Sequence, residues 1–135
     1  MAEGTTSESS AAGTPVTAAT RCDLGGDEIL PVVMRVTTTS VVEFVLFVCL
    51  APARVQIFLD TARIAEADGQ DEVRLRLPPM LPGAHSLMWS HITPSPTWKT
   101  RAEIAADGVT LFRRRKSSDG NNPTNSGFAF FEVSQ

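Results

Sequence analysis

Four side chains with useful chemistry fall within residues 85–98, which read HSLMWSHITPSPTW and hold every histidine and tryptophan of the chain: His85, Trp89, His91 and Trp98. Imidazole binds zinc and moves protons, so a metal centre is the first chemistry to consider. A strand rises about 3.3 Å per residue, which places the two histidines about 20 Å apart. Zinc–nitrogen bonds are about 2.0–2.1 Å long, so one ion does not join them. No metal, and no other cofactor, is predicted.

The same segment can instead form a carbohydrate site, in which Trp98 is an exposed platform for a sugar ring. His91 and the hydroxyl groups of loop 92–97 would then supply hydrogen bonds. Alternation along a strand favours another role for Trp89, because it shares its face with Leu87 and His91, as a core residue would. Trp98 would also lie on the same face of its strand as apolar residues that follow it, which favours packing of Trp98 in the core or at the rim of the core. Both interpretations stay open at this point.

A second candidate is the basic run FRRRK, which contains Arg113, Arg114, Arg115 and Lys116. Such a run can contact phosphate groups or an acidic protein surface, or can end a strand in solvent. Alternate residues of a strand point to opposite faces, so the run divides into two pairs, Arg113 with Arg115 and Arg114 with Lys116. The net charge of −3 and the lack of interleaved aromatic residues argue against nucleic acid as a partner.

The polar loop 117–127 contains Asp119 and Asn121, which superficially resembles a calcium loop. The EF-hand spacing and its terminal glutamate are missing, and turns favour the same residue types. Nucleophilic catalysis has no support either, because neither histidine has a carboxylate beside it in sequence and no GxSxG elbow is present. We therefore expect a protein that is not an enzyme.

The composition is that of one globular domain, with 135 residues of which 42% are hydrophobic and 20% charged. Residues 1–24 are rich in Ser, Thr and Ala and are expected to form a flexible N-terminal arm, because they bury too little apolar surface to offset the entropy of ordering. The arm is either a solvated leader or a segment that folds onto a partner subunit. Residues 25–135 are expected to form the folded domain.

Residues 1–20 lack the basic start and apolar core of a Sec signal, so a cytoplasmic protein is expected, with export by another route left open. The most apolar run, residues 41–51, is too short to span a bilayer. Two cysteines, Cys22 and Cys49, make no disulfide framework, so free thiols are expected. They can bond only if their Cα atoms come within about 7 Å.

Period-two patterning predicts about eight strands. The clearest lies at 72–77, EVRLRL, where charged and apolar residues alternate. Asp107-Gly108 separates two strand-like runs and predicts a two-residue hairpin turn. Residues 60–67 carry the one weak helix signal, and 66–71 is expected to be a turn-rich connector. Other strands are expected within 29–36, 41–49, 55–60, 84–92, 97–106, 109–116 and 128–135.

Short strands with turns between them and no helical crossovers predict an antiparallel β-sandwich or a small barrel. Residues 73–89, VRLRLPPMLPGAHSLMW, resemble the strand–loop–PGxH–strand passage common in bacterial immunoglobulin-like domains. The Cys–Trp–Cys arrangement of antibody domains is absent. The resemblance implies an immunoglobulin-like sandwich of about 7–9 strands. It also implies a scaffold or binding role, since this superfamily rarely carries catalysis.

Two functions follow as hypotheses. The first is a non-catalytic protein-interaction or assembly module, whose partner is another protein or further copies of itself in a homo-oligomer. The alternative is a small carbohydrate-binding, lectin-like module that uses Trp98 and His91. A solvent-exposed Trp98 favours the second hypothesis, and a defined multimer favours the first.

Overall fold

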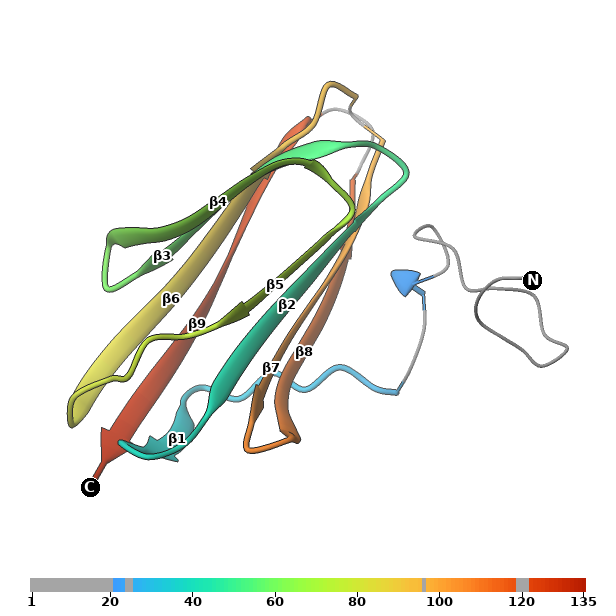
Figure 1. Cartoon of the computed structure of the whole chain (residues 1–135). Coiled ribbons are helices and arrows are strands. Elements are labelled where there is room, and N and C mark those ends of the chain that lie inside the picture. Colours follow the sequence, from blue (N-terminus) through green and yellow to red (C-terminus); the bar gives the residue numbers. More distant parts are fainter. Residues whose placement is uncertain (1–20, 24–25, 96, 119–121) are drawn as a thin grey trace, which may run out of the picture.

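The computed structural model describes residues 21–23, 26–95, 97–118 and 122–135, which form nine strands in two packed sheets (Figure 1). The strands are β1 (Met34–Thr37), β2 (Val42–Cys49), β3 (Ala53–Leu59), β4 (Ala62–Gln70), β5 (Glu72–Arg76), β6 (Gly83–Ile92), β7 (Lys99–Ala106), β8 (Val109–Ser117) and β9 (Thr124–Ser134). One sheet has the order β1-β9-β6-β3-β4 and the other the order β5-β2-β7-β8. The predicted all-β sandwich is confirmed. Most of the predicted N-terminal arm lies outside the described residues.

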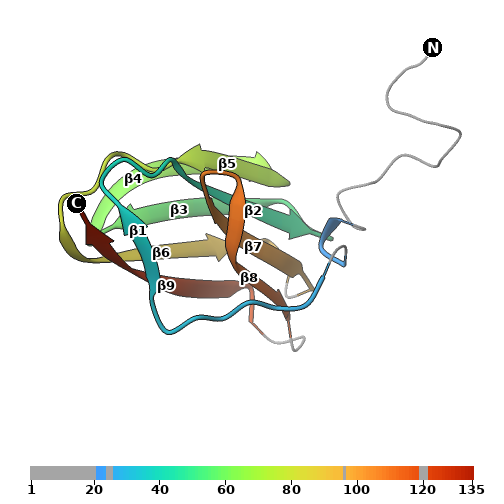
Figure 2. The ribbon, with the colours of Figure 1, turned by 90° about the horizontal axis from the view of Figure 1, so that it is seen from below.

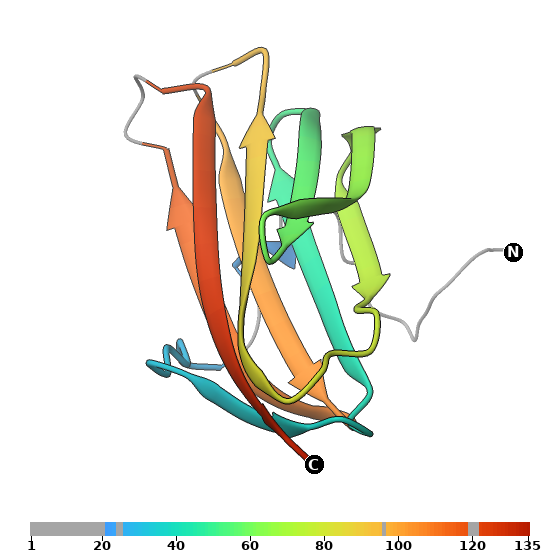
Figure 3. The same ribbon diagram turned by 90° about the vertical axis from the view of Figure 1, so that its left-hand side faces the viewer.

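Neighbouring strands pair antiparallel except for β1 and β9, which run parallel with Met34 opposite Phe131. This pair joins the first and last of the nine strands, which no short turn connects, so no turn residues in the sequence predict it. Figure 3 shows β9, β6 and β3 side by side in the five-stranded sheet, with the strands of the other sheet behind them.

The Asp107-Gly108 turn joins β7 to β8, as predicted. Both residues have positive φ, 50° and 82°, which is the conformation that a type I′ hairpin turn requires. The side chain of Asp107 also accepts a hydrogen bond from the backbone N–H of Val41, at 2.9 Å. The turn is therefore held against the neighbouring strand as well as by its own backbone.

The weak helix signal at 60–67 is wrong, because this stretch turns at Asp60-Thr61 and continues as β4. Both turn residues have positive φ, 51° and 70°, although neither is glycine. Asp tolerates this conformation, and the Asp60 carboxylate accepts a hydrogen bond from the backbone N–H of Ser86 at 2.9 Å. The expected connector at 66–71 is mostly strand, and the chain passes from one sheet to the other beyond Gly69 (φ 75°).

Strand β9 begins at Thr124, earlier than the expected residue 128. Its first residues are small and polar, which are properties of a loop in sequence. In the fold, Ser126 and Gly127 lie opposite Ser90 and Trp89 of β6. The backbone ladder, which any residue except proline can join, extends the strand here.

The hydrophobic core lies between the two sheets. Its fully buried members include Phe44, Leu46, Ile57, Leu87, Ile104 and Phe131. Trp89 is 5% exposed, and its ring centroid lies 5.0 Å from that of Phe44 and 5.7 Å from that of Phe112. The interpretation of Trp89 as a core residue is confirmed.

The expectation of free thiols is wrong, because Cys22 and Cys49 form a disulfide with their Cα atoms 6.3 Å apart. Cys49 ends β2 and Cys22 lies 27 residues earlier in the chain. Sequence spacing carries no information on this distance, which is set by how the N-terminal segment lies on the sheet.

Residues 21–23 and 26–29, which we call the strap, lie along the four-stranded sheet and then pass its β8 edge (Figure 2). The Arg21 guanidinium lies 5.8 Å from the centre of the Phe47 ring and pairs with Glu72 at 2.6 Å. Ile29 exchanges two backbone hydrogen bonds of 2.9 Å with Arg113 of β8. The strap therefore covers part of one outer face and part of one sheet edge.

Candidate functional site

His91 and Trp98 meet at one end of the sandwich, with their ring centroids 4.6 Å apart and their planes at 83°. His91 is 1% exposed and Trp98 is 5% exposed. The Trp98 Nε1–H donates to the backbone carbonyl of Asn122 at 2.7 Å, which satisfies its one polar atom. Packing of Trp98 in the core or at its rim is confirmed. Neither ring offers an open face to a sugar.

The buried imidazole of His91 has no hydrogen-bond partner at either nitrogen among the described residues. Burial lowers its pKa to about 4, and the nearby Lys116 ammonium acts in the same direction. The ring is therefore neutral at pH 7, where a charged imidazole would lack compensation.

The basic run divides between the two faces of β8 as the alternation predicts. On the outer face Arg113 donates to Glu103 at 2.5 Å and to the Asp27 carbonyl at 3.1 Å, and Arg115 donates to the Gly26 carbonyl at 2.6 Å. These guanidinium groups are thus engaged with the strap and the sheet, which the sequence pattern did not reveal.

The other pair of the run points the opposite way. Lys116 Nζ donates to the side-chain oxygen of Asn125 and to the carbonyl of Ser126 on β9, each at 3.3 Å. Arg114 lies on the same face of β8 as Lys116 and is half-buried. Burial, followed by the charge of Arg114, lowers the pKa of Lys116. The four cations therefore do not form one continuous surface.

Asp119 and Asn121 lie outside the described residues. Among the residues that the structure does describe, no three His, Cys, Asp or Glu side chains gather in a way that would hold a metal ion. In the same residues, no helix is long and apolar enough to cross a bilayer.

Asp60 and His85 form a pair that sequence reasoning missed. His85 Nδ1 lies 2.5 Å from an Asp60 carboxylate oxygen, and His85 Nε2 lies 2.7 Å from the carbonyl of Leu81. Both ring nitrogens face acceptors, which the doubly protonated ring satisfies. The bond to Asp60, and next that to Leu81, raises the pKa of His85. The pair links the β3–β4 turn to the first residues of β6.

An apolar row crosses the outer face of the five-stranded sheet. Phe58, Met88 and Phe128 lie opposite one another on β3, β6 and β9. Phe128 and Phe130 are each 51% exposed, and Ile92 is 56% exposed. We call these five residues the apolar face. The motif FAFF is apolar on both faces of its strand, which was a sequence signal for an apolar outer face. A single sequence does not show which of the two faces is buried in the core.

A hollow of about 280 Å³ lies beside the apolar face. Its lining residues are Val33, Asp60, Ala84, His85, Ser86, Phe130, Phe131 and Glu132. The Asp60–His85 pair therefore forms part of its wall.

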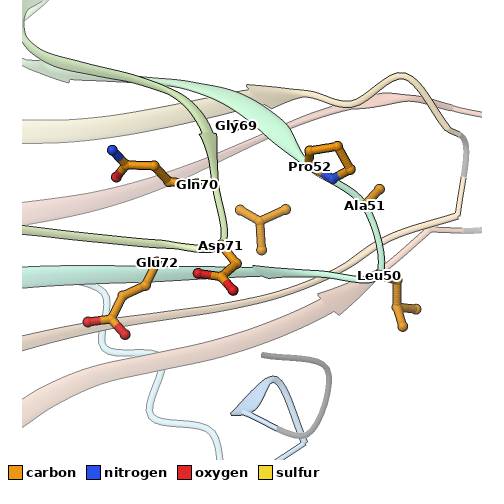
Figure 4. Close-up of a pocket in the computed structure, with 8 residues that line it drawn as sticks. Leu50, Ala51, Pro52, Gly69, Gln70, Asp71 and Glu72 are labelled. Carbon is orange, nitrogen blue, oxygen red and sulfur yellow. The ribbon is translucent and has the colours of Figure 1, made fainter. Parts of the chain in front are cut away.

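A second hollow of about 520 Å³ lies at the turn between β2 and β3 (Figure 4). Its walls come from two segments and contain Val48, Leu50, Ala51, Pro52, Gly69, Gln70, Asp71 and Glu72. Glu72 is already paired with Arg21 and Arg74, at 2.6 and 3.2 Å. This hollow contains none of the residues that the sequence singled out.

Comparisons of the chain with models of protein families, with curated proteins and with solved structures find no match.

Proposed function

We propose that this protein is a non-catalytic protein-interaction module that associates with a second copy of itself through the apolar face. An immunoglobulin-like sandwich would serve as its rigid scaffold. The observation that carries the proposal is the exposure of Phe128 and Phe130 on the outer face of the five-stranded sheet. Contiguous exposed apolar residues mark interaction surfaces, and aromatic and Met residues are enriched there.

The energy available supports an interface. Burying a whole Phe side chain contributes about 1.5–3 kcal/mol. Phe128 and Phe130 each expose about half of their surface, so covering both contributes roughly as much as burying one whole Phe. Met88, Phe58 and Ile92 add to this sum.

The opposite outer face of the sandwich has a different character. On the four-stranded sheet, Glu103 accepts hydrogen bonds from Arg101 at 2.6 Å and Arg113 at 2.5 Å, and the strap packs over this group. Burial opposes ionisation of Glu103, but the two arginines lower its pKa. A charged face whose carboxylate and guanidinium groups already pair with one another and with the strap offers little to a partner, which favours the apolar face.

A second copy suits the apolar face because its flanks are neutral. At one end of the row, Arg63 pairs with Glu66 at 3.5 Å. Towards the C-terminal end of β9, beyond Phe130, Arg35 of β1 lies opposite Glu132. Two such faces meet without net repulsion, whereas a strongly acidic or basic partner would find no excess of opposite charge.

The test is sedimentation velocity on the full chain over a range of concentrations. We expect the unchanged protein to form a dimer and the variant Phe128→Ser/Phe130→Ser to remain a monomer. Val109→Ser is the matched control, because Val109 is an apolar residue with 62% exposure that lies at the β7–β8 turn. A monomer at every concentration, or a dimer that survives the double substitution, would contradict the proposal.

A further inference from the structure

We propose that the two copies pack face to face about a two-fold axis that runs along the row Phe58–Met88–Phe128, so that Ile92 of each copy enters the hollow at Ala84 of the other. This inference rests on the proposed self-association and adds its geometry. The three residues of the row share one register level across β3, β6 and β9, so a single line perpendicular to the strands passes through all of them.

The register determines which residues would meet across this axis. In an isologous contact the same patch is used on both copies. A residue on one side of the axis therefore meets, on the other copy, the residue of the same strand that lies equally far from the axis on its other side. On β6, Ile92 and Ala84 are equally distant from Met88, as are Ser90 and Ser86. The aligned pair of sheets would lie about 10 Å apart, the usual spacing of a sandwich.

The side chains at these positions complement one another in size. Ile92 is 56% exposed, and Ala84 contributes a small side chain to the hollow of about 280 Å³. On β9, the bulky Phe130 would face the small Ser126 across the axis. Large residues thus meet small ones on both sides of the row, as in packed sheet interfaces.

The charges also match. On β3, Asp60 would face the amide of Gln56, which can donate a hydrogen bond to it. On β9, Glu132 would face Thr124 rather than another acid. Arg63 lies at the end of the row and would approach Arg63 of the other copy, but each Arg63 is already paired with Glu66. No unpaired like charges are brought together on these strands.

Another axis is possible for the same face, and it makes different contacts. An axis parallel to the strands and centred on β6 would place every β6 residue opposite itself. Ile92 would then meet Ile92, and Ala84 would meet Ala84. The two geometries share only the contact of Met88 with itself.

Single-cysteine variants distinguish the two axes. Both native cysteines are in a disulfide, so an introduced cysteine supplies the one free thiol of the chain. Ile92→Cys and Ala84→Cys, each given a distinct mass tag, are treated with a short bismaleimide separately and as a mixture. We expect a cross-linked heterodimer in the mixture and no cross-link with either variant alone. Ile92 and Ala84 are exposed, so both substitutions leave the core intact.

Met88→Cys reports on the face itself, and Val109→Cys is the control at the distant turn. Cross-linking of Met88→Cys together with the mixed heterodimer supports the proposed axis. Cross-linking of Ile92→Cys or Ala84→Cys alone overturns the axis but leaves the self-association through this face intact. A dimer in which Met88→Cys does not cross-link, or a monomer in sedimentation, overturns both the axis and the proposed function.

Discussion

The indole of Trp89 packs directly on the backbone of Gly127, its partner across the β6–β9 ladder. A Cβ atom at position 127 would lie 2.4 Å from both Cε2 and Cζ2 of Trp89. The ring is also held by Phe44 and Phe112, so it has little room to move away. Gly127 therefore provides the space that the largest core side chain occupies.

Gly127→Ala should lower the free energy of unfolding by about 1–3 kcal/mol or more, because overpacking a close-packed core forces neighbours off their preferred rotamers. Urea denaturation followed by tryptophan fluorescence measures the change. Ser126→Ala, one residue away on the exposed side of β9, should stay within about 0.5 kcal/mol of the unchanged protein. Equal stability of the two variants would contradict the close contact.

The disulfide should contribute strongly to stability. Replacing Cys22 and Cys49 together by Ser releases a link across 27 residues of sequence, and we expect a loss of about 3–4 kcal/mol. Chemical denaturation in the presence and absence of a dithiol reductant measures it. The reductant should destabilise the unchanged protein and have no effect on the double variant, and any other pattern counts against a structural disulfide.

His91 should make the protein sensitive to acid. Its pKa is about 4 in the folded state, whereas an unfolded chain protonates near 6.5. Between these values the unfolded state binds more protons, so stability is full above pH 6.5 and falls by on the order of 3 kcal/mol as the pH drops towards 4. His91→Leu removes this titration. The unfolding free energy of the unchanged protein minus that of the variant, measured from pH 7.5 to 4, should decrease on acidification.

His85 should act in the opposite direction. Because its pKa is raised by Asp60 and Leu81, its stabilising effect is complete below the ordinary value of 6.5 and is lost as the pH rises through the folded-state pKa. Asp60→Asn removes the main cause and should return the pKa of His85 towards 6.5 in an NMR titration. Asp68→Asn on β4, an exposed carboxylate that is not bonded to His85, is the matched control and should leave that pKa unchanged.

Local patterns in the sequence were sufficient for the strands and several of their faces. Alternation placed Leu87, Trp89 and His91 on the buried side of β6, and Asp107-Gly108 located a hairpin, because both signals act over a few residues. The helix signal at 60–67 failed for a related reason. Its turn depends on the Asp60 carboxylate, whose partners His85 and Ser86 are distant in sequence.

The candidate site depended on tertiary structure. A cationic run such as Arg113–Lys116 has the same sequence whether it faces solvent or contacts the strap, and only the path of residues 21–23 and 26–29 distinguishes these cases. Likewise, the burial of Trp98 follows from its contact with His91 in a different strand.

The sequence by itself determined the all-β class and the core parity of β6, since alternation is a property of neighbouring residues. Only the tertiary structure decided that Cys22 reaches Cys49 and that Phe58, Met88 and Phe128 stand in one row on the outer face of a sheet. The first depends on how the N-terminal segment lies on the sheet, and the second on the register between strands far apart in the chain. That register is set by the packing of the whole core, and no short stretch of sequence contains it.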